Sequence, residues 1–173
     1  MTGGDDDFRS PVDRAALVRI RDRLRTQRQV GRVSLTLRRG VPCLVVEYDL
    51  SWYPDPVEAA YLDVRWYVND DFEIHYHESW PNDEWNHRWD RHPNPHNTRD
   101  HVHQPPDAAT PGEDTVHPDE LHEVMRTVEQ SVNERIRSLW DDIRSTGDDI
   151  RSSEAEIRSP EDEIRSQGDE PSR

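Results

Sequence analysis

Lysine is absent from this chain of 173 residues, so all 22 of its basic residues are arginine. Aspartate and glutamate together number 37, which gives a formal net charge of −15 at neutral pH. Many solvated carboxylates keep a protein soluble in salt that screens charge repulsion to roughly 3 Å at 1 M. We therefore expect a protein adapted to high salt. Because its net charge then reflects the solvent, RNA is not excluded as a partner, and local arginine placement decides phosphate binding.

Cysteine and long apolar runs are also scarce. Cys43 is the only thiol, which excludes an intramolecular disulfide and a zinc site built on cysteine. No apolar run approaches the ~20 residues that cross a bilayer. Residues 1–9 lack the basic start and the apolar block of a signal peptide. These absences predict a cytoplasmic protein without a membrane partner, in which residues 1–9 are disordered.

Apolar residues make up only 31% of the chain, but they are concentrated in its middle. Five of the six tryptophans lie between Trp52 and Trp89, whereas the C-terminal segment has almost nothing apolar except isoleucine. The length is that of one ordinary domain. We predict a single α+β domain over residues 10–140 and a disordered acidic tail over residues 141–173.

The tail repeats the triplet Ile-Arg-Ser with a period of seven residues. Its isoleucines are Ile143, Ile150, Ile157 and Ile164. A coiled-coil seam needs two apolar residues in every seven, and here there is one. Gly147 and Pro160 also interrupt the pattern. Disorder is therefore the prediction for the tail, with a partner-binding helix as the alternative.

Two predicted helices flank a run of predicted strands. Ser10 and Pro11 are residue types that begin a helix, which is expected to continue to about Arg28. Pro118 opens a second helix whose apolar residues recur at three and four positions. Between the helices, alternating apolar residues predict four strands, and a fifth is predicted at 85–90. The alternating residues are Val33, Leu35 and Leu37; Leu44, Val46, Tyr48 and Leu50; Leu62, Val64, Trp66 and Val68; and Phe72, Ile74 and Tyr76.

Short turns between these strands favour a four- to five-stranded antiparallel meander with the helices on one face. Residues 90–115 are rich in Pro, His, Asn and Asp, and we expect them to form a long loop. Loops of this length in a small domain are usually functional or disordered.

Histidine gives the main functional signal. Seven of the nine histidines lie between positions 75 and 103, and they are His75, His77, His87, His92, His96, His101 and His103. His75 and His77 alternate with predicted core residues, so both should lie on the sheet face opposite the core. His101 and His103 should likewise share one side of an extended segment.

Two kinds of chemistry fit this pattern. Imidazoles bind zinc and other transition metals, but neither a His-Glu-x-x-His helix nor a cysteine pair supports such a site. No cofactor is therefore expected, and a transition metal is the alternative. Acid–base catalysis needs an imidazole that takes a proton, another that donates one, and an arginine that stabilises an anionic transition state. Residues of these types within sixteen positions are Arg88, Asp90, His96, Arg99, Asp100, His101 and His103.

The segment Arg88-Trp89-Asp90-Arg91-His92-Pro93, then His96 and His101-Val102-His103, then a helix from Pro118, resembles the TumE family of small toxins. That family shows an Arg-aromatic-Asp motif, a Pro-His step and a His-x-His element in the same order. The resemblance covers about residues 30–135. The family commonly has adjacent histidines near both elements, whereas His92 and His96 are separated here. The resemblance implies the toxin half of a toxin–antitoxin pair, with a cognate antitoxin protein as partner.

The resulting hypothesis is a toxin that cleaves RNA. Its candidate residues are Arg88, Asp90, His96, His101 and His103. His101 or His103 would act as general base or acid with His96 as its partner, Arg88 would bind phosphate, and Asp90 would orient an imidazole. The alternatives are a non-enzymatic module that holds a protein partner, a metal-dependent hydrolase, and a polar loop without chemistry.

Overall fold

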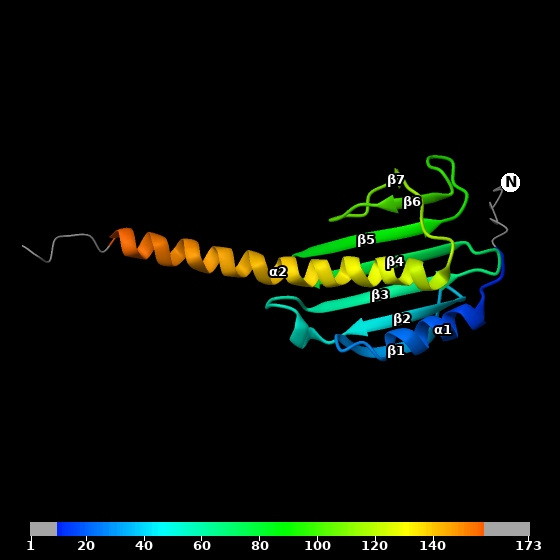
Figure 1. The fold of residues 1–173 in the computed structure, drawn as a ribbon, viewed down its shortest axis with the longest axis horizontal. Helices are drawn as coiled ribbons and strands as arrows, with labels where there is room; N and C mark the ends of the chain where they lie inside the picture. The colour runs from blue at the N-terminus through cyan, green and yellow to red at the C-terminus, as the bar shows by residue number, and fades with distance from the viewer. Residues whose placement is uncertain (1–9, 158–173) are drawn as a thin grey trace, which may run out of the picture.

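A computed structural model describes residues 10–157, with side chains up to residue 146. These residues form one antiparallel sheet whose seven strands lie side by side in chain order, together with two long helices (Figure 1). The elements are α1 (Arg14–Leu24), β1 (Val30–Arg38), β2 (Val41–Tyr48), a 3₁₀ turn (Leu50–Trp52), β3 (Ala59–Trp66), β4 (Phe72–Trp80), β5 (Asp83–Arg91), β6 (Asp100–His103), β7 (Glu113–Asp114) and α2 (Leu121–Ile157). The predicted antiparallel meander between two helices is confirmed, with more strands than expected.

The core lies between one face of the sheet and the two helices. In β3 and β4, buried residues alternate with partly exposed ones, as the pleat of a strand requires. The tight turn between these strands pairs Trp66 with Phe72, which confirms the predicted hairpin. The helices bury the apolar residues recurring at helical spacing, which include Ala16, Leu17, Ile20, Leu24, Val124, Met125, Val128, Val132 and Leu139.

The stretch predicted as one long loop, residues 90–115, contains strands β6 and β7. Side-chain hydrogen bonds order the loops around them, because the amide of Asn97 donates to the Gly112 carbonyl at 2.7 Å. The N–H of Gly112 donates back to Asn97 Oδ1 at 3.1 Å. A Cβ on Gly112 would lie 2.7 Å from the Val102 carbonyl oxygen, so the chain can pass this close to β6 only with glycine. The high proline and asparagine content concealed two strands that are too short to show a period.

The edge of the sheet also differs from the prediction. Helix α1 ends at Leu24, before the expected Arg28. Leu35 and Leu37, predicted to be half-buried with Val33, lie near the β1–β2 turn on the edge strand and are 45% and 65% exposed.

Two further predicted strand residues lie outside the strands. Leu50 belongs to the 3₁₀ turn, because β2 ends at Tyr48, and Val68 follows the end of β3. Both are exposed.

Helix α2 does not end near residue 140 but continues to Ile157, so the first part of the repeat is helical rather than disordered. Ile136 and Leu139 are buried, and the indole of Trp140 donates to the Trp52 carbonyl at 2.9 Å. Beyond these contacts the helix runs past the end of the sheet (Figure 1). The rest of the predicted tail and residues 1–9 lie outside the described residues. Within the described part, no helix is both long and apolar enough to cross a bilayer.

A buried acid fastens α2 to the sheet. Glu78 on β4 is fully buried on the helix side. Arg135 of α2 donates to its Oε1 at 3.0 Å and to its Oε2 at 2.8 Å. The Tyr76 hydroxyl and the Trp80 indole donate to the same carboxylate at 2.9 and 3.2 Å. The helices thus stay on one face, and the opposite face of the sheet is left open.

Candidate functional site

The open face of the sheet carries two rows of polar side chains. Residues paired across antiparallel strands point to the same face, so the strand register fixes these rows. One row runs through Asp63, His75, Arg88 and His103, and the other through Arg65, Glu73, Asp90 and His101. The expectation that His75 and His77 share this face, and that His101 and His103 share a side, is confirmed by the register.

Asp90 is the centre of the second row and is fully buried. Its Oδ2 accepts a hydrogen bond from Arg88 Nη2 at 2.5 Å. Three imidazole nitrogens lie near the same oxygen, namely Nε2 of His103 at 3.3 Å, of His101 at 3.6 Å and of His92 at 3.8 Å. We call Arg88, Asp90, His92, His101 and His103 the Asp90 cluster.

Each imidazole of the Asp90 cluster directs its other ring nitrogen to a backbone carbonyl oxygen. The Nδ1 contacts are His92 with Pro93 (3.1 Å), His101 with Thr98 (3.1 Å) and His103 with Ala109 (2.9 Å). Because a carbonyl oxygen can only accept, Nδ1 carries the proton, and the neutral ring keeps its lone pair at Nε2. Three Nε2 lone pairs therefore face the negative Asp90 carboxylate. A proton bound to one of these nitrogens would replace this repulsion with a hydrogen bond to the carboxylate.

The pKa values in the Asp90 cluster are moved in opposite directions. The Asp90 carboxylate raises the pKa of His92 above its ordinary value, although burial opposes it. Burial lowers the pKa of His101, and the nearby Asp90 only partly offsets this. Burial would raise the pKa of Asp90, but His92 and Arg88 together lower it. One imidazole that holds its proton more tightly and one that holds it less tightly, both beside one carboxylate, are the groups that acid–base chemistry needs.

A second set of hydrogen bonds holds β6 behind the cluster. The Arg91 guanidinium donates to Asp100 at 2.8 Å and to the Pro118 carbonyl at 2.9 Å. Asp100 also accepts from the backbone N–H of His117 at 2.9 Å. The His117 Nε2 lies 3.1 Å from the His101 carbonyl oxygen. These bonds connect β5 and β6 with residues 117–118, which precede α2, and so fix the backbone that carries His101.

Four of the five predicted site residues meet in the Asp90 cluster, and His96 is the exception. His96 is exposed in the loop after β5, where its backbone N–H bonds to the Asn94 side chain at 2.9 Å. His92 is the member that the sequence reasoning missed. A signal for it was present, because Arg88, Asp90 and His92 are spaced by two and so share one face of a strand.

Two other residues of suitable type are engaged elsewhere. Arg99 donates to Asp71 at 2.8 Å, and Asp100 is held by Arg91. Neither contacts Asp90 in the part of the chain that the structure describes.

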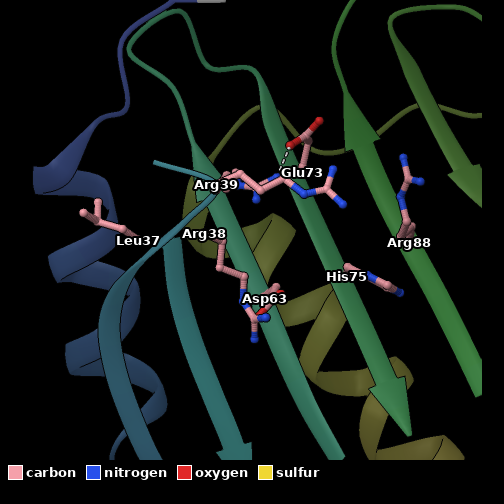
Figure 2. Close-up of a pocket in the computed structure, with 8 residues that line it drawn as sticks. Leu37, Arg38, Arg39, Asp63, Glu73, His75 and Arg88 are labelled. Atoms are coloured by element: carbon pink, nitrogen blue, oxygen red, sulfur yellow. Dashed lines mark hydrogen bonds and ion pairs between the residues drawn. The ribbon is translucent and has the colours of Figure 1, made fainter. Parts of the chain in front are cut away.

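A hollow of about 690 Å³ adjoins the Asp90 cluster on the open face (Figure 2). In Figure 2, α2 lies behind the strands and the lining side chains lie in front of them. They come from β1, β3, β4, β5 and the β1–β2 turn, and are Leu37, Arg38, Arg39, Asp63, Arg65, Glu73, His75 and Arg88. Arg88 belongs to both the hollow and the Asp90 cluster, so the two are continuous.

Comparison with protein families matches residues 15–136 to the family described as Toxin TumE. The chain belongs to the TumE toxin family. The family match begins within α1, so it extends beyond the resemblance at residues 30–135, and it includes every strand and the Asp90 cluster. No curated protein and no solved structure matches the chain significantly.

His87 differs from the histidines of this TumE-family site, because it lies on the helix side of β5. Burial lowers its pKa to about 4, and its Nε2 has no hydrogen-bond partner among the described residues. The unfolded chain, with an ordinary pKa near 6.5, binds the proton more tightly. Stability from this group is therefore fully present above pH ~6.5 and is lost as the pH falls toward ~4, by up to about 3 kcal/mol.

We expect the free energy of unfolding of His87→Leu to fall less than that of the wild type when the pH is lowered from 7 to 4.5. Unfolding by guanidinium chloride at each pH measures this free energy. The exposed His122 on α2 provides the control, because His122→Leu should follow the wild-type pH dependence. An unchanged pH dependence in His87→Leu would contradict the role of burial at His87.

Proposed function

We propose that this protein is the toxin of a toxin–antitoxin pair, that it acts in the cytoplasm by cleaving RNA, and that a cognate antitoxin protein is its partner. Membership of the TumE toxin family supports the biological role. One observation carries the chemistry: Arg88 and three imidazoles converge on a single buried carboxylate on the open face of the sheet.

Exposure distinguishes the members that can touch a substrate from those that support them. The side chains of Arg88 and His92 are 32% and 17% exposed, whereas those of His101 and His103 are 2% and 5% exposed. We assign Arg88 and His92 to the substrate. His101 and His103 then hold Asp90, which in turn keeps the proton on His92.

The proposed cleavage needs a base, an acid and a cation. The base removes the proton of a ribose 2′-hydroxyl, whose oxygen bonds to the adjacent phosphorus. The bond from phosphorus to the next 5′ oxygen breaks, and the acid protonates that oxygen. The products are a 2′,3′-cyclic phosphate and a 5′-hydroxyl. An arginine beside the phosphorus stabilises the negative charge that develops in the transition state.

His92, whose pKa is raised, is the acid in this scheme, and Arg88 is the cation. His75 is suited to be the base, because burial lowers its pKa and it pairs with Arg88 across β4 and β5. Its Nε2 lies 2.8 Å from Asn86 Oδ1 and donates to it, which leaves the lone pair of the neutral ring at Nδ1.

The test is cleavage of RNA by the purified full-length chain and identification of the new termini. We expect His92→Gln and Arg88→Gln each to slow cleavage at least about a hundredfold. His122→Gln on α2 is the matched control and should be as active as the wild type. His96→Gln should also be active, because His96 lies outside the cluster. If His96→Gln is inactive and His92→Gln is active, the assignment is wrong.

Metal-dependent hydrolysis is a second candidate, because ligand atoms of Asp90, His101 and His103 lie within 4.8 Å of one another. The contacts of His101 Nδ1 and His103 Nδ1 with backbone carbonyl oxygens are also typical of metal-bound histidines. Arg88 argues against it, since its guanidinium already contacts Asp90 Oδ2, the oxygen that lies 3.6 and 3.3 Å from His101 and His103. Elemental analysis of untagged protein and cleavage in a chelator separate the candidates. Stoichiometric metal and chelator-sensitive cleavage would favour the hydrolase.

A further inference from the structure

The hollow beside the Asp90 cluster concentrates positive charge on an acidic protein. Its lining contains four arginines and two carboxylates, whereas the whole chain has a net charge of −15. Two of the arginines are partly neutralised, because Arg38 Nε lies 3.0 Å from Asp63 and Arg65 Nη1 lies 3.0 Å from Glu73. Counted over the lining alone the surplus is two positive charges; that of Arg88 is paired with the buried Asp90, and that of Arg39 is exposed. A local surplus of this kind attracts a polyanion even where the chain as a whole does not.

Donor groups in the hollow remain available to an anion. Arg39 is exposed at the β1–β2 turn, where its positive φ of 54° precedes the φ of 79° of Gly40. Phosphate oxygens are acceptors that suit guanidinium donors of this kind.

Aromatic rings lie beside these arginines on the open face. Tyr61 and His77 pair across β3 and β4, and their ring centres are 4.8 Å apart. The guanidinium carbon of Arg38 lies 5.6 Å from the centre of the Tyr61 ring. Proteins that bind single-stranded nucleic acid combine cations that follow the backbone with rings on which bases stack.

The hollow and the Asp90 cluster form one continuous surface. Arg88 lines the hollow and donates to Asp90, and Glu73 of the hollow lies 4.0 Å from His92 Nε2. From β3 to β6 this surface crosses three strand spacings, or roughly 14 Å. A phosphate between Arg88 and His92 would thus place neighbouring nucleotides over the hollow.

We propose that the hollow binds the backbone of single-stranded RNA beside the bond that the Asp90 cluster cleaves. The assignment rests on the proposed function for the RNA substrate, but binding can be measured without cleavage. Arg38 and Arg39 contact phosphates in this arrangement, and Tyr61 and His77 contact a base.

The experiment measures fluorescence anisotropy of a short, labelled, single-stranded RNA whose 2′-hydroxyls are methylated and therefore cannot be cleaved. The full-length wild type is compared with Arg38→Gln/Arg39→Gln over a series of salt concentrations. We expect roughly tenfold weaker binding by this variant. The slope of log affinity against log salt should fall by about 1.4, because two phosphate contacts on a single strand are lost.

The matched control is Arg14→Gln/Arg19→Gln, which removes two exposed arginines from α1 on the opposite side of the sheet. It should bind like the wild type. The proposal would be overturned if both double variants lost the same affinity for RNA. It would also be overturned if the wild type bound duplex RNA more tightly than single-stranded RNA. If the wild type binds through the hollow but cleaves no RNA with free 2′-hydroxyls, the inference stands and the proposed function fails.

Discussion

Asp90→Ala is expected to lower the free energy of unfolding by about 3–5 kcal/mol, because it removes one partner of a buried charge pair. Arg88 would lose its carboxylate, and the Nε2 atoms of His101 and His103 would lose the group that they face. Unfolding by urea at constant ionic strength measures the change. The proposed cleavage of RNA should be lost at the same time, since the carboxylate that raises the pKa of His92 would be absent.

Two comparisons make the Asp90 result interpretable. Glu58→Ala removes an exposed carboxylate just before β3 and should change stability by no more than about 0.5 kcal/mol. Asp90→Asn keeps the shape and loses the charge, so it should unfold less readily than Asp90→Ala while still being inactive. A fully stable Asp90→Ala would show that the carboxylate is not the centre of the cluster.

The second large effect is expected at Glu78, which joins α2 to β4. Glu78→Met should cost about 3–5 kcal/mol, because Arg135 would then be partly buried without its charge partner. The Tyr76 hydroxyl and the Trp80 indole would also lose their acceptor. Unfolding of Glu78→Met, Arg135→Met and the double variant forms a double-mutant cycle.

In that cycle, the double variant should lose much less stability than the sum of the two single variants. The reason is that removing both charges leaves neither one buried alone. Additive losses would mean that the ion pair does not hold the helix, and that the two side chains act independently.

The central strands could be predicted from the sequence because their two faces differ sharply. The pairs Trp66–Phe72 and Val64–Ile74 place large apolar residues on one face, while Asp63 and His75 lie on the other. At the edge the same alternation was misleading. Leu35 and Leu37 have the correct period, but they lie on the edge strand β1 and are exposed. A periodic pattern predicts a strand, whereas burial depends on what the rest of the chain places over it.

The candidate site was predictable in part for the same reason. Arg88 and Asp90 are two positions apart, and so are His101 and His103, so each pair shares a face. Their convergence depends on the pairing of β5 with β6, and the loop between these strands has no periodic pattern that predicts this register. His96 was chosen for its Pro-His step. His92 was missed because the fifth strand was predicted to end at residue 90, which put His92 in the predicted loop; β5 in fact continues to Arg91.

The order of the strands has a consequence for folding kinetics. Each strand of the described sheet pairs with its neighbours in the chain, so no crossover has to close before the next pair forms. Sheets built from such local contacts fold faster than those with distant pairings. The Asp90 cluster and its row partners come from β3, β4, β5 and β6 and from the residue after β5, one uninterrupted stretch of chain. That stretch can assemble hairpin by hairpin, with the docking of α2 as the late step that closes the longest loop.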